Sequence, residues 1–355
     1  MQILSATEAV SAAIQRTREV LFGPFRWRQS WKLAAVAALA CLAILYVPSI
    51  PNQAAFRNLP PDAPQAARVV MSIMQSFMTV FILGMDILAI ILFYLGSRLQ
   101  LVMFDVVCMR QTMVTPSWRK YRDRRWRWFG INLIPSCVFA IPLSIVTLLY
   151  SRRVTAFAHH IQPGTPPPMH FFGYVFAMVA AIMLLMFAGA VASSIVQDFL
   201  LPPVALENAS LGLSCNRLGR AFSEEPGAFA LYLLLKIVLG IVVAIAAYIA
   251  LGLAIVAPGI FVALIGWVIH LAVHGLTGKL LLALYCVIAA LAAMVYSLYV
   301  YVLILGIVRT FFQAYAVYFY GGRYQPLGDL LEPPPPVYVA APVDDVPPMF
   351  PPPVA

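Results

Sequence analysis

The sequence predicts an all-α, polytopic integral membrane protein with six transmembrane helices and an N-terminal amphipathic interfacial helix. Hydrophobic residues make up 62% of its 355 residues and charged residues only 10%, and the mean hydropathy is +0.88. Soluble domains are about 25% charged. This composition excludes a soluble globular or disordered chain. The apolar residues also form runs of about the 20 residues needed to cross a bilayer.

The N-terminal segment, residues 1–30, is expected to lie at the membrane interface. Ser5 and Glu8 have the spacing of a capping box, apolar residues recur at helical intervals, and Gly23 with Pro24 gives a stop signal. Such a helix would lie flat on the inner leaflet, with Arg16 and Arg18 meeting anionic lipid. The aromatic and basic residues that follow would anchor it.

Six apolar runs are candidates for spans within a transmembrane domain of residues 31–324. They cover residues 33–47, 69–95, 128–150, 171–196, 228–256 and 280–308. The apolar stretch 260–276 follows Pro258 and contains His270 and His274, so we expect a re-entrant or lateral helix, with a seventh span as the alternative. Small residues four apart, such as Gly240 with Ala244, are expected at close helix contacts.

The basic residues predict the orientation. With six spans, most of the 23 Lys and Arg residues fall on the side that holds both termini, which should therefore be cytoplasmic. The net charge of +9 then reports topology and attraction to anionic lipid headgroups. Interleaved aromatic and basic residues at 118–128 also suit single-stranded nucleic acid. We favour membrane anchoring because they adjoin a span, and we expect no nucleic-acid partner.

Chemical motifs are scarce. The five cysteines share no metal-ligand spacing, and the pair His270 and His274 has no further ligand nearby in the sequence. No nucleotide-binding loop, nucleophile elbow or paired-carboxylate loop is recognisable. We therefore expect no enzymatic activity, no metal and no cofactor. The proline-rich segment 325–355 is expected to be a disordered cytoplasmic tail.

Three runs carry a resemblance to a known family. They are FYLGSRLQLVMFDVV (93–107), VQDFLLPPVALENASLGLSCNRLGRAFSEEPGAFALYLLLK (196–236) and VRTFFQAYAVYFYGGRY (308–324). Together they resemble an uncharacterised bacterial membrane family, described as glycerophosphoryl diester phosphodiesterase membrane-domain-like. The resemblance implies a membrane region without the catalytic barrel, so no catalytic residue is carried over.

Four charged residues match that family's pattern: Arg98, Asp105, Asp198 and Arg309. All four would lie at the cytoplasmic ends of spans. There they would either tie the bundle together or form a shared headgroup or solute site.

Asp86 is the only acidic residue deep in an apolar run, and intramembrane carboxylates are functional candidates. Gln75 and Thr79 lie near the same helical face. Lys236 has a matching depth, so we predict an intramembrane polar site in which Asp86 contacts Lys236. This contact would be a structural ion pair or a proton or solute relay.

The sequence thus favours a non-enzymatic, multi-pass protein of the bacterial inner membrane. It would act as a scaffold or accessory protein for lipids or a membrane complex, through its basic cytoplasmic face and proline-rich tail. The alternative is a transporter or channel-like protein with a polar path around Asp86.

Overall fold

The computed structural model describes residues 2–23, 27–41, 65–109, 114–160, 169–272 and 275–332, and every regular element in these ranges is a helix. The elements are α1 (Ala6–Phe22), α2 (Trp27–Ala40), α3 (Gln65–Met109), α4 (Val114–Lys120), α5 (Arg125–His160), α6 (Met169–Ile195), the π-helical turn η3 (Val196–Leu200), α7 (Leu201–Glu207), α8 (Leu211–Glu224), α9 (Pro226–Ala272), α10 (Gly275–Gly321) and α11 (Gln325–Leu331). The predicted all-α class is confirmed.

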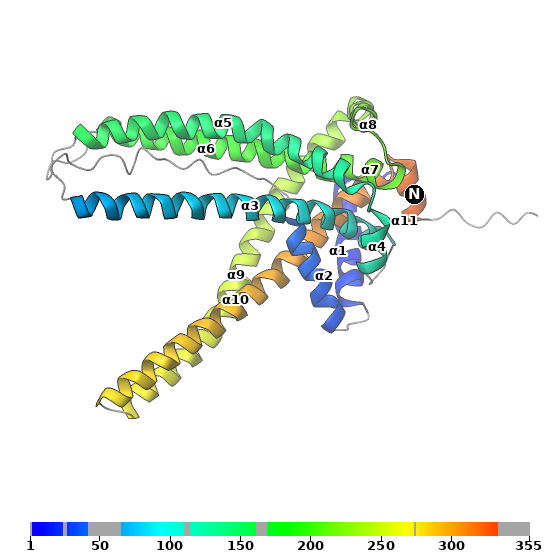
Figure 1. The fold of residues 1–355 in the computed structure, drawn as a ribbon. Helices are drawn as coiled ribbons and strands as arrows, with labels where there is room; N and C mark the ends of the chain where they lie inside the picture. The colour runs from blue at the N-terminus through cyan, green and yellow to red at the C-terminus, as the bar shows by residue number, and fades with distance from the viewer. Residues whose placement is uncertain are drawn as a thin grey trace, which may run out of the picture.

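The helices form two arms that diverge from a common base (Figure 1). The three-helix arm consists of α3, α5 and α6, and the two-helix arm is the hairpin of α9 and α10. The base contains the short helices and the adjoining ends of the long ones. Helices α1 and α11 both lie in it, and Arg323 Nη1 donates to the Leu4 carbonyl at 3.2 Å. The first and last described segments are therefore packed together.

Aromatic packing forms the centre of the base. Phe199, Tyr232 and Phe319 are almost fully buried. The ring centroids of Tyr232 and Phe319 are 4.4 Å apart, and those of Phe199 and Tyr232 are 5.3 Å apart. These rings join η3, α9 and α10, so the long helices meet in a specific core before they separate into arms.

The predicted capping box is present at the start of α1. Glu8 N donates to Ser5 Oγ at 3.3 Å, and Ser5 N donates to Glu8 Oε2 at 2.8 Å. The expected lipid contact of Arg16 is wrong, because this side chain is buried. Its Nε and Nη2 each donate at 2.8 Å, to the carbonyls of Val107 and Cys108. Arg16 thus satisfies the last carbonyls of α3, where a cation is favoured by the helix dipole.

Five helices are long and apolar enough to cross a membrane among the described residues, compared with the six predicted. The predicted first span, 33–47, coincides only with the short α2, and residues 42–47 lie outside the described ranges. α2 packs closely on α10. A Cβ added to Gly306 would lie 2.4 Å from the Ala34 carbonyl oxygen, so only glycine permits this approach.

The expected break near Pro258 is absent. Helix α9 continues through Pro258 to Ala272, and α10 begins at Gly275. The re-entrant helix and the seventh span are therefore both wrong: 260–272 is the distal part of α9. Proline is tolerated inside apolar helices, and α5 likewise contains Pro135 and Pro142.

The predicted tail also needs a correction. Residues 325–331 form α11, and Leu327 is fully buried in the base rather than part of a solvated extension. The remaining tail, 333–355, and the anchor residues 24–26 lie outside the described residues.

Candidate functional site

A π-helical turn places two polar side chains inside the base. In η3, the neighbouring residues Gln197 and Asp198 are both buried. Pro202 and Pro203 follow the turn and lack an N–H, so they cannot donate the usual bonds to the carbonyls of Asp198 and Phe199. This explains why the helix widens here. Single π-helical turns inside α-helices are frequent at functional sites.

Asp198 is the centre of the first polar cluster. Its Oδ2 accepts hydrogen bonds from Ser194 Oγ at 3.2 Å and Tyr232 Oη at 3.0 Å, and it forms an ion pair with Lys236 Nζ. The side chain of Asp198 is 5% exposed and that of Lys236 is 16% exposed. Because Ser194 belongs to α6 whereas Tyr232 and Lys236 belong to α9, this carboxylate joins the two arms.

Lys236 therefore pairs with Asp198 instead of the predicted Asp86. Tyr232 and Lys236 are four residues apart and share the helical face that meets η3. The prediction compared only the depths of Asp86 and Lys236 along their spans, and depth does not show which face of the helix carries Lys236. Asp86, Gln75 and Thr79 lie in the three-helix arm, where Thr79 Oγ1 donates to the Gln75 carbonyl at 2.8 Å. The structure does not bring them to Lys236.

A chain of hydrogen bonds crosses the base next to this cluster. Arg309 Nη2 donates to Gln197 Oε1 at 2.7 Å, and Gln197 Nε2 donates to Asn132 Oδ1 at 3.5 Å. Asn132 Nδ2 donates to Gln100 Oε1 at 3.3 Å, and Gln100 Nε2 donates to the Ala40 carbonyl at 3.1 Å. The chain connects α10, η3, α5, α3 and α2. Buried amides hold a unique arrangement when each finds its partner.

Asp105 is the centre of a second cluster, which holds α4 against α3. It accepts hydrogen bonds from Ser117 Oγ at 2.6 Å, Lys120 Nζ at 2.6 Å and Tyr121 Oη at 3.0 Å. Burial, and then the charge of Asp105, raises the pKa of Tyr121. The neutral phenol thus remains a hydrogen-bond donor to the carboxylate.

The four family-pattern charges all lie in the base but belong to two sets of contacts. Arg98 Cζ lies 3.5 Å from the centroid of the Trp118 ring, near the Asp105 cluster on α4. Arg309 instead contacts η3, because it donates to Gln197, the neighbour of Asp198. The predicted headgroup anchor Trp128 is instead fully buried, with Nε1 donating to Gln100 at 3.0 Å. These side chains therefore connect neighbouring helices within the base.

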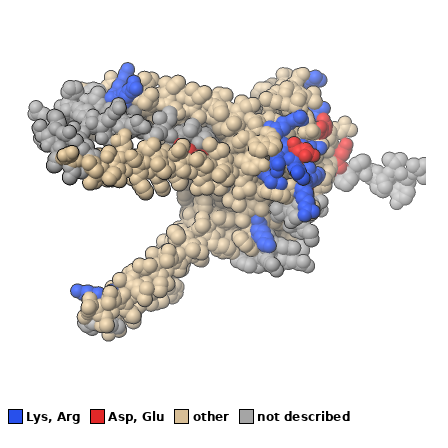
Figure 2. All heavy atoms as spheres, in the orientation of Figure 1, with Lys and Arg blue, Asp and Glu red and all other residues tan. Residues whose placement is uncertain are grey.

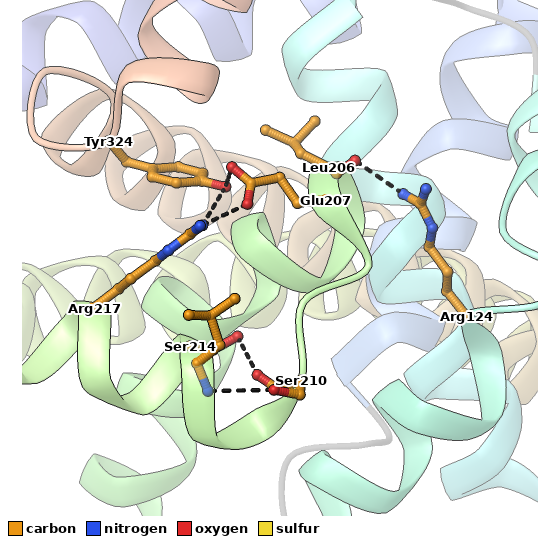
Figure 3. Close-up of polar contacts among 8 residues, drawn as sticks. Arg124, Leu206, Glu207, Ser210, Ser214, Arg217 and Tyr324 are labelled. Atoms are coloured by element: carbon orange, nitrogen blue, oxygen red, sulfur yellow. Dashed lines mark hydrogen bonds and ion pairs between the residues drawn. The ribbon is translucent and has the colours of Figure 1, made fainter.

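Figure 3 shows a further polar group that sequence reasoning missed. Arg217 Nη1 lies 2.6 Å from Glu207 Oε2, and Tyr324 Oη donates to Glu207 Oε1 at 2.8 Å. On the opposite side, Arg124 donates to the carbonyl of Leu206 at 3.3 Å. These residues are far apart in the sequence, so no sequence pattern predicts their contacts. The one local pattern is Ser210 at the start of α8, where its side chain caps the helix by accepting a hydrogen bond from Leu213 N at 3.4 Å.

An apolar cleft lies between α6 and α9, beside the Asp198 cluster. Its volume is about 320 Å³, and Ser194 and Lys236 supply its polar end. Gly240, which we expected at a close helix contact, lines this cleft, and a Cβ placed on it would meet nothing within 4 Å. The small residue here keeps a space open. Sequence reasoning missed the cleft because it depends on how two helices diverge.

Among the described residues, no three His, Cys, Asp or Glu side chains are grouped so that they could hold a metal ion. The five cysteines are free thiols.

Comparisons with known proteins give one family. No curated protein and no solved structure is significantly similar to the chain. The model of a family of unknown function, DUF7544, matches residues 4–330. The match runs from the segment before α1 to α11 and so includes the base, both arms and each polar cluster described above. The chain belongs to DUF7544, a family of unknown function.

Proposed function

We propose that the protein is a non-enzymatic, multi-pass protein of the bacterial inner membrane that serves as a scaffold or accessory protein for lipids or a membrane complex. The observation that carries this proposal is a contrast between the side chains of the base and those of the arms. Charged groups in the base bind one another, whereas the arms present apolar side chains outward. Phe176 is 76% exposed and Phe261 is 68% exposed. Apolar surfaces of this extent suit lipid or partner helices.

The distribution of charge supports a cytoplasmic base. Figure 2 shows most of the visible Lys and Arg residues gathered at the base, with few on the arms. Because positive residues are retained on the cytoplasmic side, the base and both chain ends would face the cytoplasm. The base would then offer the basic surface for anionic headgroups or protein partners.

The likeness to glycerophosphoryl diester phosphodiesterase membrane-domain-like proteins belongs to this proposal. The charges that match the pattern of that family include Asp105 and Asp198, and each forms an ion pair within the base. These contacts support a role in organising a membrane.

A transporter or channel-like protein is the second candidate, because of one residue. Asp86 is half-buried in the three-helix arm between the exposed side chains of Met85 and Ile87. A carboxylate at such a position is costly in a membrane and marks ion or proton pathways in many proteins.

Reconstitution separates the two candidates. Proteoliposomes loaded with a pH-sensitive dye, or with Na⁺ in a second set, are compared with protein-free liposomes. The scaffold proposal predicts no added flux of protons or Na⁺, and it predicts anionic phospholipid that copurifies with the protein. A flux that Asp86→Asn abolishes, with folding unchanged, would replace the scaffold by the transporter.

A further inference from the structure

We propose that the cleft between α6 and α9 is a binding site for one anionic phospholipid, with an acyl chain between the helices and the phosphate at Lys236. This inference rests on the proposed membrane function and deepens it, because it names the lipid class and its site.

The walls of the cleft suit an acyl chain. Phe187, Ala190 and Val191 of α6 face Ile237, Gly240 and Ile241 of α9. The volume of about 320 Å³ is at the lower end of the range for ligand pockets, about 300 to 1,000 Å³. The arms that contain α6 and α9 diverge from the base (Figure 1). A polar solute would gain little from these walls.

The end of the cleft suits a phosphate. Lys236 lines it, and Asp198 behind Lys236 is more deeply buried. An ammonium group has three donors, so the ion pair with Asp198 leaves others for a ligand. Arg309 donates to Oε1 of Gln197, the neighbour of Asp198, at 2.7 Å, so a second cation lies close to this cluster. Two cations then accompany one carboxylate, and the excess positive charge favours an anionic headgroup over a zwitterionic one.

The location matches the depth of a headgroup. Lys236 lies ten residues into α9, or about 15 Å from its start, and its long side chain can extend toward the base. Under the proposed orientation, the base adjoins the cytoplasmic leaflet, where the headgroups lie. The site would therefore take lipid from that leaflet through the open side of the cleft.

Native mass spectrometry of the full-length protein in detergent, titrated with phosphatidylglycerol or phosphatidylcholine, tests the site. Gly240→Leu places a side chain in the acyl-chain space, and nothing near Gly240 obstructs it. Gly252→Leu is the matched control on the same helix, outside the cleft and equally unobstructed. We expect Gly240→Leu to weaken phosphatidylglycerol binding about tenfold, as loss of about two methylene contacts implies. The control should bind as the wild type does.

Headgroup recognition is tested separately. Lys236→Met should remove the preference for phosphatidylglycerol over phosphatidylcholine, whereas Lys236→Arg should keep it. The Arg variant and Gly240→Leu retain a cation beside Asp198, so they remain informative if Lys236→Met unfolds. A preference that persists in folded Lys236→Met would overturn the phosphate assignment.

Unchanged phosphatidylglycerol binding in Gly240→Leu would overturn the cleft as the site. A change in oligomeric mass, with no change in bound lipid, would assign the cleft to a helix of a second copy and equally reject the inference. Neither outcome decides the scaffold proposal, which the flux measurement on proteoliposomes tests separately.

Discussion

The base and the arms are built from the same long helices but on different principles. In the base, Asp198 and Asp105 each have three hydrogen-bond partners, and aromatic rings are stacked in a closed core. In the arms, the most apolar windows of α9 and α10 are 0% buried within the protein. The base is therefore specified by its own contacts, whereas the arms would depend on lipid or partner helices. Substitutions should be far more harmful in the base.

The largest difference is expected for buried carboxylates. Asp198→Ala should destabilise the protein by about 3 kcal/mol, because it leaves a buried lysine without its counter-ion. Asp86→Asn, in the arm, should cost less. Thermal unfolding in detergent measures both.

A double variant sharpens this test. Asp198→Leu combined with Lys236→Met removes both charges and should recover much of the stability lost in Asp198→Ala, because no uncompensated charge remains. The single variants Asp198→Leu and Lys236→Met are measured beside the double variant. If all three are as stable as the wild type, the ion pair between Asp198 and Lys236 does not hold the arms together.

Glycine gives the next contrast. Gly306→Ala should destabilise the base by about 2 kcal/mol, because the new methyl group would overlap the Ala34 carbonyl and push α2 from α10. Gly252→Ala in the two-helix arm meets no neighbour and should be neutral or slightly stabilising. Equal effects in the same unfolding assay would show that α2 does not pack as described.

A small effect is expected at the exposed rim of the base. Arg217→Ala removes the ion pair with Glu207, whose two side chains are each 34% exposed. Such pairs contribute up to about 1 kcal/mol. The loss should shrink further at high salt, where the charges are screened. A salt-independent loss would instead assign the effect to packing of Arg217 on Tyr324.

The smallest effect is a pH dependence at the start of α1. The Ser5 backbone N–H, and then its side chain, lowers the pKa of Glu8 below its usual value of 4.5. The stabilisation is therefore present above pH 4.5 and is lost as the pH falls through the lowered pKa. Hydrogen exchange of the first amides of α1, corrected for intrinsic rates, should show this loss in the wild type. In Glu8→Gln, protection should be independent of pH in this range.

The sequence predicted what depends on local pattern. Helix class, the capping box of Ser5 and Glu8, and the location of Asp105 and Asp198 near the ends of long apolar helices all follow from periodicity and composition. The pairing of Lys236 did not follow, because depth in a span is a linear measure whereas a contact requires a shared face. Trp128 and Arg16 were misassigned to lipid for the same reason. An aromatic or basic residue at the end of a helix has the same local sequence pattern whether its side chain faces a lipid headgroup or a protein core.

The contact between Leu4 and Arg323 has a consequence for biosynthesis. Helix α1 is synthesised before the other described helices, but its packing partner, the end of α10, follows about 300 residues later. Gly322 also lies directly against the backbone of Ile3. At about 5 to 20 residues per second, the interval lasts on the order of 15 to 60 seconds. Throughout this time the buried alanines of α1, Ala6, Ala9 and Ala13, lack their final partner, so the base can close only after the end of α10 has been synthesised.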